Sequence, residues 1–331
     1  MSPEPPPANG TPGPDPDRPA LAAVHRPVLS DEVVSWLVPE GREGVVLVDG
    51  TAGGGGHTRL LAERVGTAGR VVGIDRDPAM LALAEEAVRG LPVTLIHAPY
   101  RDVKEVLADL GLDSVDGILL DLGLSSDQLS WTHRGFSFAT DGPLDMRFDP
   151  DGDGPSAADL VNTLNEEELA RIIYEYGEER FSRRVARRIV EARKLGAITT
   201  TGKLAELVRR SIPGKWGPLD VSTRTFQALR IAVNDELGQL ESTLALLPDV
   251  LRPGGRAAII SFHSLEDRRV KHAFRDDPRL NVLTRKPVTA SPGELATNPR
   301  ARSAKLRVAE RCPIQAGTMD APTPRKTGKP R

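Results

Sequence analysis

The stretch Val45-Val46-Leu47-Val48-Asp49-Gly50-Thr51-Ala52-Gly53-Gly54-Gly55-Gly56-His57 joins a short apolar run to an acid and then to four consecutive glycines. This order predicts a buried strand that stops at a glycine-rich turn and continues as a helix. Such a turn leaves bare backbone N–H groups at a helix N-terminus, where a ligand can approach closely. Further along, Arg70-Val71-Val72-Gly73-Ile74-Asp75 again ends an apolar strand in a carboxylate, as expected of an acid that binds ribose hydroxyls. The two stretches together predict a Rossmann-like half that binds a nucleotide-type ligand.

Strands and helices alternate through the first 125 residues, which predicts a parallel sheet with crossover helices. The expected strands are 45–49, 70–75, 93–97 and 117–121, with helices at 78–89 and 102–110. Asp77 and Pro78 are typical of a helix start. The next region lacks strand patterns and favours helices at 166–176, 181–194 and 201–210. The alternation then resumes with a helix at 225–247, a strand at 256–262 and an edge strand at 304–310.

The predicted architecture is an α/β Rossmann-like sheet interrupted by an all-helical insertion. Its parts are a disordered proline-rich tail at 1–20, a discontinuous Rossmann-like domain at 21–130 and 222–312, a helical insertion at 131–221 and a disordered basic tail at 313–331. The tail at 1–20 contains eight prolines and cannot form a secretory apolar segment. No apolar run is long enough to span a membrane. We therefore expect a cytoplasmic protein with no membrane partner.

Cysteine usage and charge further limit the class of protein to which this chain can belong. Cys312 is the single cysteine, so neither an intrachain disulfide nor a cysteine metal cluster can form, and we expect no metal site. The net charge of −2 hides two basic blocks, with net charges of +9 at 180–215 and +11 at 268–331. Basic blocks on an otherwise acidic chain indicate a polyanionic partner such as nucleic acid. Solvated arginine-rich helix faces would also account for a single block of this kind.

The glycine loop itself limits the choice of ligand. It lacks the third glycine of a dinucleotide fingerprint, because Thr58 stands there, and the chain contains no P-loop motif. A nucleoside ligand without a pyrophosphate, such as S-adenosylmethionine, remains. Its positive sulfonium would favour an acid-lined mouth formed by Asp49 and Asp121. A tight turn alone would also explain the glycines, and helix capping would also explain Asp75. For His57, packing or capping competes with ligand contact.

Several motifs now carry a resemblance to a known family. They are Asp49-Gly50-Thr51-Ala52-Gly53-Gly54-Gly55-Gly56-His57, Gly73-Ile74-Asp75-Arg76-Asp77-Pro78, Asp121-Leu122-Gly123-Leu124-Ser125-Ser126-Asp127-Gln128, Arg134-Gly135-Phe136-Ser137-Phe138, Gly142-Pro143-Leu144-Asp145-Met146-Arg147, Thr223-Arg224-Thr225-Phe226-Gln227-Ala228 and Ser261-Phe262-His263-Ser264-Leu265-Glu266-Asp267-Arg268. In this order they resemble the MraW-type family over roughly 24–311. These bacterial enzymes use S-adenosylmethionine to methylate the N4 amine of a cytidine in the decoding region of small-subunit 16S rRNA. The resemblance implies a class I methyltransferase sheet.

The resemblance also implies roles for individual residues. Gly55, Gly56 and His57 would touch the cofactor, Asp75 would hold the ribose, Tyr100 would pack on the adenine, and Asp121 and Gln128 would line the pocket. Two positions depart from the family, which often has Phe at position 100 and Pro at position 127.

The chemistry of amine methylation points to Asp121. Methyl transfer from a sulfonium needs alignment more than a strong base, whereas the weakly nucleophilic amine needs hydrogen-bond acceptors. Asp121, after the fourth strand, is the candidate catalytic residue as well as a cofactor ligand. Methylation at ring carbon C5 would need a cysteine nucleophile, and Cys312 is badly placed for it. Ser261-Phe262-His263-Ser264 lacks a hydrolase motif, and we interpret Ser264 with Asp267 as a capping box.

RNA binding would fall to the insertion. Arg134, Phe136 and four arginines of the 181–194 helix are the candidates, with Phe138 and Trp131 as further stacking residues. Those helix arginines are Arg183, Arg184, Arg187 and Arg188. A rival hypothesis is a non-catalytic rRNA-binding assembly factor that keeps the methyltransferase fold, and an oxidoreductase is a more distant one.

Overall fold

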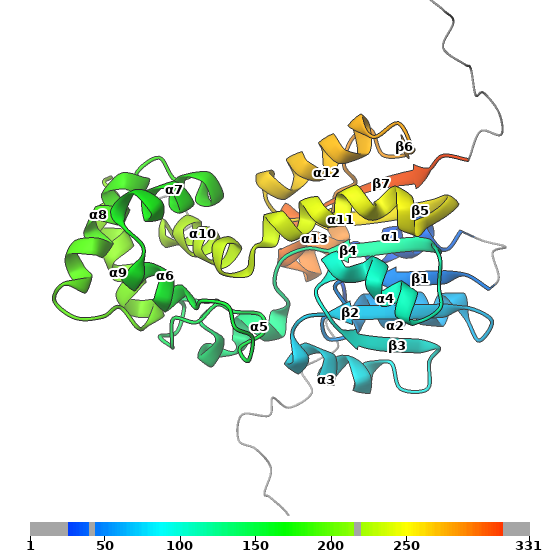
Figure 1. Ribbon diagram of the computed structural model, residues 1–331, viewed down its shortest axis with the longest axis horizontal. Coiled ribbons are helices and arrows are strands. Elements are labelled where there is room, and N and C mark those ends of the chain that lie inside the picture. The colour runs from blue at the N-terminus through cyan, green and yellow to red at the C-terminus, as the bar shows by residue number, and fades with distance from the viewer. Residues whose placement is uncertain (1–25, 40–43, 215–219, 314–331) are drawn as a thin grey trace, which may run out of the picture.

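The computed structural model describes residues 26–39, 44–214 and 220–313 (Figure 1). The tails predicted at 1–20 and 313–331 lie outside these ranges, apart from residue 313. None of the helices within the described ranges has the length and apolar character needed to cross a lipid bilayer.

A seven-stranded sheet forms the centre of the part of the molecule that contains all the strands. Its strand order is β3-β2-β1-β4-β5-β7-β6. The first five strands of this order are parallel, whereas β7 runs antiparallel to both β5 and β6. The predicted α/β class is therefore confirmed. The strands are β1 (Val46–Asp49), β2 (Arg70–Asp75), β3 (Val93–His97), β4 (Val115–Asp121), β5 (Leu251–Ser261), β6 (Leu280–Val282) and β7 (Lys305–Arg311).

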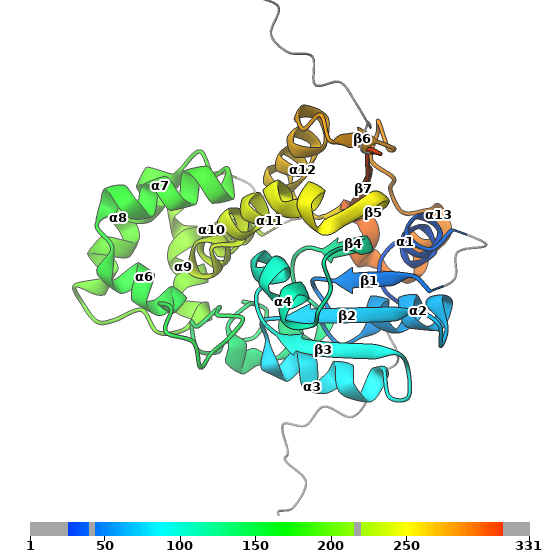
Figure 2. The ribbon, with the colours of Figure 1, turned by 45° about the vertical axis from the view of Figure 1, so that its right-hand side comes forward.

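Helices cover both faces of the sheet, and each face has its own hydrophobic core (Figure 2). One core packs α4 (Val103–Asp109), α11 (Glu236–Val250) and α12 (Ser264–Asp276) on the sheet. The other packs α1 (Ser30–Leu37) and α2 (Gly56–Val65). Strands buried on both faces need residues without polar side chains at successive positions, which is why β1, β2 and β4 contain the uninterrupted runs 46–48, 71–74 and 117–120.

The chain leaves the sheet after β4 to form a helical layer. After α5 (Ser126–Ser130) and the turn η2 (Thr132–Arg134) come α6 (Ala157–Thr163), α7 (Glu166–Gly177), α8 (Ser182–Arg193) and α9 (Thr201–Ser211). These helices enclose a third core that also contains Phe226 and Leu229 of α10 (Ser222–Asn234). The helical layer therefore extends to residue 234 and does not end at 221, where the sequence placed its boundary.

The single helix expected at 225–247 is wrong, because α10 and α11 are separate helices. Asp235 lies between them in the left-handed conformation, with φ 47° and ψ 40°. Asn and Asp adopt this conformation more readily than other non-glycine residues, so Asn234-Asp235 is a suitable breaking point. The Asn234 side chain also accepts a hydrogen bond from the Phe148 N–H at 3.0 Å and donates one to the Met146 carbonyl at 2.7 Å. The break passes the chain from the helical layer back to the sheet.

Two further expectations near the C-terminus need correction. The strand predicted as an edge, β7, is internal, because β6 pairs outside it. The capping box of α12 uses His263 and Glu266 instead of Ser264 and Asp267. Asp267 instead pairs with Arg307 of β7 at 2.7 Å. The remaining helices are α3 (Pro78–Ala87), capped by Asp77 as predicted, and α13 (Pro292–Thr297), followed by the turn η3 (Pro299–Ser303).

Candidate active site

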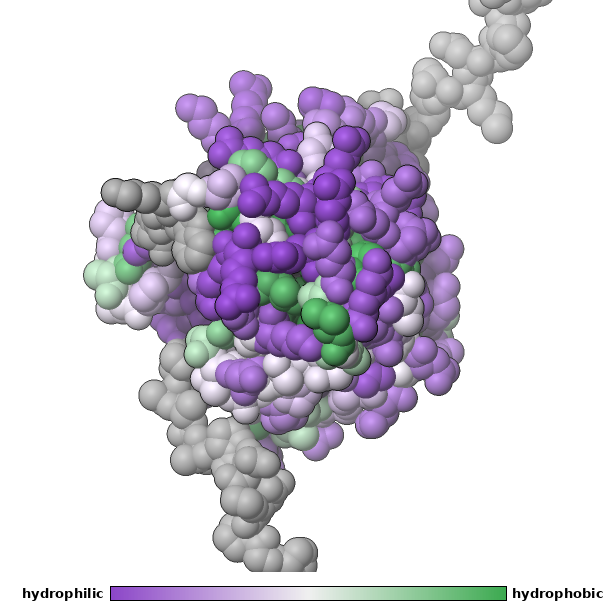
Figure 3. Space-filling view, turned by 90° about the vertical axis from the view of Figure 1, so that its left-hand side faces the viewer, coloured by the Kyte–Doolittle hydropathy of each residue, from purple (hydrophilic) through white to green (hydrophobic). Residues whose placement is uncertain are grey.

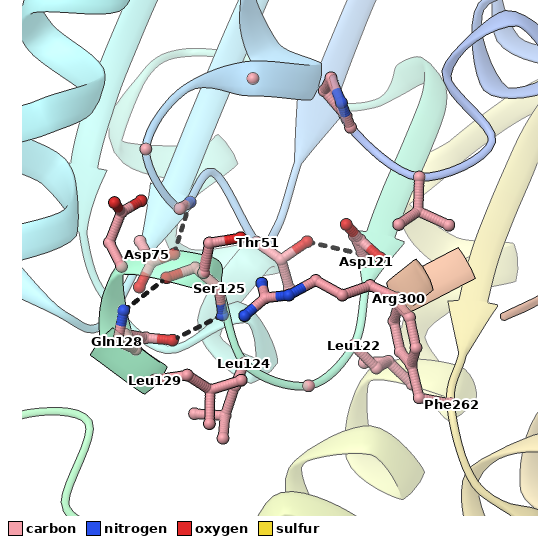
Figure 4. A pocket seen from close by; sticks show the side chains of 18 of the residues that line it. Thr51, Asp75, Asp121, Leu122, Leu124, Ser125, Gln128, Leu129, Phe262 and Arg300 are labelled. Carbon is pink, nitrogen blue, oxygen red and sulfur yellow. Dashed lines mark hydrogen bonds between the residues drawn. The ribbon is translucent and has the colours of Figure 1, made fainter. Parts of the chain in front are cut away.

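A cavity of about 1900 Å³ lies at the carboxyl ends of the parallel strands, with the start of the helical layer as its other wall (Figure 4). Carboxyl ends of parallel strands are the usual ligand-binding edge of such sheets. Its lining includes the glycine loop and the ends of β2 and β4, together with six residues from later in the chain: Phe262, His263, Glu266, Asn298, Arg300 and Ser303. Segments far apart in the sequence therefore meet at one site.

The glycine loop forms the floor of this cavity beside α2. Gly55 takes φ 84°, and a Cβ there would lie 3.0 Å from the Ala87 Cβ and 3.1 Å from the Ala84 Cα. Both the backbone conformation and the close approach to α3 require glycine at this position. Gly56 and His57 begin α2, whose first-turn N–H groups have no intrahelical partner and are available to a ligand.

Asp75 lies at the end of β2 with two free acceptor sites. Its Oδ2 accepts a hydrogen bond from the Gly53 N–H at 2.7 Å, and its Oδ1 accepts one from the Asp77 N–H at 2.9 Å. Each carboxylate oxygen can accept a second bond, so the pair suits a vicinal diol. Burial raises the pKa of Asp75 to about 6, although those two backbone donors act in the opposite direction.

A buried cluster joins the ends of β1 and β4 beneath the cavity. The His57 Nε2 lies 3.5 Å from the Asp121 Oδ2, and the imidazole is 5% exposed. Asp49 is fully buried and accepts a hydrogen bond from the Thr58 hydroxyl at 2.7 Å. The expectation that Asp49 lines the mouth of the site is therefore wrong, whereas Asp121 does line the cavity.

The charges in this cluster favour a protonated His57. Burial opposes the charged imidazole, but the adjacent Asp121 and Asp49 outweigh it and raise the pKa of His57. Thr51 fixes Asp121 from the other side, because its hydroxyl accepts a hydrogen bond from the Asp121 N–H at 2.7 Å. The Asp121 Oδ1 is buried and has no hydrogen-bond partner among the described residues. The side chain as a whole is 25% exposed and lines the cavity, so a ligand would reach this carboxylate at its exposed oxygen, not at Oδ1.

Tyr100 and Gln128 both line the cavity, but their polar groups bind the protein itself. The Tyr100 hydroxyl donates to the Glu236 carbonyl at 3.3 Å, and burial raises its pKa. The Gln128 Nε2 donates to the Asp77 Oδ2 at 2.8 Å, while its Oε1 accepts from the Ser125 N–H at 3.0 Å. Tyr100 can offer its ring to a ligand, and Gln128 fixes the loop that follows β4.

The structure contradicts the RNA-binding role expected for Arg134. Its side chain is 5% exposed and its Nη2 lies 2.9 Å from the Oδ2 of the fully buried Asp77. The same group donates to the carbonyls of Arg147 at 3.1 Å and Phe148 at 2.7 Å. Arg134 therefore attaches the start of the helical layer to the N-cap of α3.

The predicted aromatic residues divide in a similar way. Phe136 is 7% exposed and packs on Phe148, with ring centroids 5.2 Å apart, so it belongs to the core of the helical layer. Phe136 also contributes to the cavity lining, but little of its ring is exposed there for a base to stack on. Phe138 is half-buried, lines the cavity and packs edge-on against Phe226. Trp131 lies outside the cavity lining and stacks with His133.

The arginines of α8 are exposed, as the prediction required. Arg183, Arg184, Arg187 and Arg188 all face solvent, and Arg187 forms an ion pair with Glu166 at 3.4 Å. Figures 1 and 2 both place α8 on the side of the helical layer remote from the sheet. The end of the molecule that carries this layer is largely hydrophilic (Figure 3). The stretch of RNA that contacts α8 would therefore lie away from the cavity, and a nucleotide in the cavity would belong to another part of the same RNA.

Sequence reasoning missed two features of the site. Thr51 orients Asp121, and Arg300 of η3 enters the cavity from the far end of the chain. Thr51 belongs to the glycine-loop motif described above, whereas no local sequence pattern indicated Arg300. No cluster of three or more His, Cys, Asp or Glu side chains suited to a metal occurs within the described ranges.

The strand order, with β7 antiparallel and a cavity at the carboxyl ends of β1, β2 and β4, defines a class I methyltransferase fold. The MraW methylase family model matches residues 22–312, and the chain belongs to this family.

Relatives of known name agree with this assignment. A protein named Ribosomal RNA small subunit methyltransferase H from Deinococcus deserti is 53% identical over 89% of this chain and 96% of its own length. A protein of the same name from Geobacter sulfurreducens is 52% identical over 87% of this chain and 98% of its own length. The solved structure of a rRNA methylase from Streptococcus thermophilus matches 86% of this chain and 94% of its own chain, with a TM-score of 0.40 and 11% sequence identity. A similarity of this level supports no conclusion about function.

Proposed function

We propose that the protein uses S-adenosylmethionine to methylate the N4 amine of a cytidine in the decoding region of 16S rRNA, in the cytoplasm. The observation that carries the donor assignment is Asp75, whose two oxygens each bind one backbone N–H and retain one acceptor site for a ribose diol. The rRNA substrate is supported by the names of the relatives. The cytidine amine and its place in the decoding region follow from the sequence resemblance.

The residues around the cavity fit this donor. When bound, S-adenosylmethionine supplies a methyl group already activated on a sulfonium. Asp75 would bind the ribose, the Tyr100 ring would pack on the adenine, and Gly55 and Gly56 would let the methionine portion approach the backbone. The negative charge of Asp121 suits a nearby cation.

The same residues favour an exocyclic amine over a ring carbon as acceptor. The Asp121 carboxylate, which lines the cavity and is 25% exposed, can accept a hydrogen bond from the amine, orient its lone pair and stabilise positive charge as it develops. Cysteine-dependent methylation at C5 is not available, because Cys312 follows β7 and is absent from the cavity lining. His57 and Thr51 hold Asp121 in place for this task.

The test is transfer of labelled methyl from S-adenosylmethionine to small ribosomal subunits that lack the modification, followed by nucleoside analysis. The expected product is N4-methylcytidine. Replacement of Asp121 by Ala should abolish transfer and leave RNA affinity nearly intact. Unchanged methylation by this variant would contradict the catalytic role of Asp121, and a wild-type protein that binds rRNA without transferring methyl would favour an assembly factor.

A further inference from the structure

Five arginines line the cavity, and four of them already have partners. Arg26 pairs with Asp31, Arg59 pairs with Glu63 at 2.8 Å and Arg230 pairs with Glu236 at 2.7 Å. Arg76 donates to the Asn234 carbonyl at 2.9 Å and lies over the Phe148 ring. The fifth is Arg300, and within the described part of the chain its guanidinium has neither an ion pair nor a hydrogen bond.

Arg300 enters the site from a firmly anchored segment. The neighbouring Ala301 and Ala304 are each 1% exposed and belong to the core that packs α1 and α2. Before it, the Asn298 amide donates to the Arg26 carbonyl at 3.3 Å. In Figure 4 the Arg300 side chain extends across the cavity toward Ser125. The fold thus presents this guanidinium to the ligand space from a rigid backbone.

The electrostatic setting of Arg300 is unfavourable without a ligand. Burial lowers its pKa, and Asp127 is the nearby acid that acts in the opposite direction. A guanidinium stays protonated in proteins and has five donors in a planar fork. Partial burial of such a group without an acceptor is costly, and an oxyanion that binds it in the bidentate geometry removes this cost.

We propose that Arg300 is the oxyanion-binding residue of the cavity, an inference that rests on the proposed function. Two oxyanions would enter during the reaction, the carboxylate of the methionine portion of the donor and a phosphodiester next to the acceptor nucleotide. The sulfonium and the amine are excluded as partners of Arg300, because one is cationic and the other lacks a negative charge. Asp127 favours the carboxylate, since an acid beside Arg300 complements the ammonium of an α-amino acid and repels a phosphate.

The experiment compares Arg300→Gln and Arg300→Lys with wild type. Calorimetric titration gives the Kd for S-adenosylmethionine, and methyl transfer at saturating donor gives the KM for unmodified small subunits. Arg302→Gln is the matched control, because Arg302 is exposed on the same turn and outside the cavity lining. A general loss of positive charge would affect both Gln variants alike, whereas loss of a cavity ligand affects Arg300→Gln alone.

For the carboxylate, Arg300→Gln should weaken donor binding roughly 10- to 100-fold, the range for a lost hydrogen bond to a charged group, and leave the KM for subunits unchanged. Arg300→Lys should recover part of this loss. The defect should disappear when decarboxylated S-adenosylmethionine is the titrant. If Arg300 binds the phosphodiester instead, Arg300→Gln should raise the KM for subunits and leave the Kd for the donor unchanged.

If the Arg300 variants keep the wild-type Kd for the donor and the wild-type KM for subunits, the inference about Arg300 is overturned. Methyl transfer by the wild-type protein would still uphold the proposed function. A wild-type protein that neither bound the donor nor transferred methyl would overturn both. Because the Arg300 guanidinium forms neither a hydrogen bond nor an ion pair with the described residues, both variants should unfold at the wild-type temperature.

Discussion

Replacing Arg134 by Met should destabilise the protein strongly, because Arg134 neutralises a buried acid. Asp77 is fully buried, and Arg134 lies 2.9 Å from its Oδ2 with a side chain only 5% exposed. Removing one partner of such a pair leaves an uncompensated charge, at a cost of roughly 3–5 kcal/mol. Met keeps most of the volume of the arginine stem, so loss of packing adds little. Urea denaturation followed by circular dichroism measures the change in the free energy of unfolding.

Two further variants separate this charge effect from other causes. Asp77→Asn combined with Arg134→Met leaves no buried charge and keeps an N-cap for α3, so it should be more stable than Arg134→Met alone. Arg183→Met removes an exposed arginine and should change the free energy of unfolding by no more than about 0.5 kcal/mol. The reasoning would be refuted if Arg134→Met unfolded like wild type but bound rRNA more weakly than Arg183→Met, since Arg134 would then be an RNA ligand.

Three other predictions follow from the site and the helical layer. Because Asp75 has a pKa of about 6 and must be ionised to accept ribose hydroxyls, donor affinity should fall as the pH drops below 6, to about one tenth at pH 5. The Asp75→Asn variant should lose this pH dependence. A wild-type donor affinity that stays constant from pH 7.5 to 5 would contradict the role of Asp75. Replacing the four exposed arginines of α8 by Gln should reduce the salt dependence of rRNA binding by a slope of about 3, and an unaltered slope would place the RNA surface elsewhere. Gly55→Ala should lower thermal stability and donor affinity more than Gly90→Ala does. Both glycines have a positive φ, but only a Cβ at position 55 would meet neighbouring atoms. Equal effects of the two substitutions would show that the close approach to α3 is unimportant.

The sequence by itself determined the α/β class, most of the strands and the acids at their ends. Apolar runs such as 70–75 and 93–97 predicted β2 and β3 with the observed bounds. The glycine run with Asp75 predicted a ligand site at the carboxyl edge of the sheet, where the structure has its cavity. These features depend on local periodicity and turn chemistry, which neighbouring residues encode.

Only the tertiary structure decided which charged groups face a ligand and which neutralise one another. Arg134 and Arg300 are both arginines in loop-like sequence, yet one is buried on Asp77 and the other lines the cavity without an ion pair to any described residue. Similarly, the periodicity of 225–247 continues through Asp235, and the break appears because α10 and α11 pack into different cores. Burial and charge pairing arise from residues that are distant in sequence, so no local pattern could reveal them.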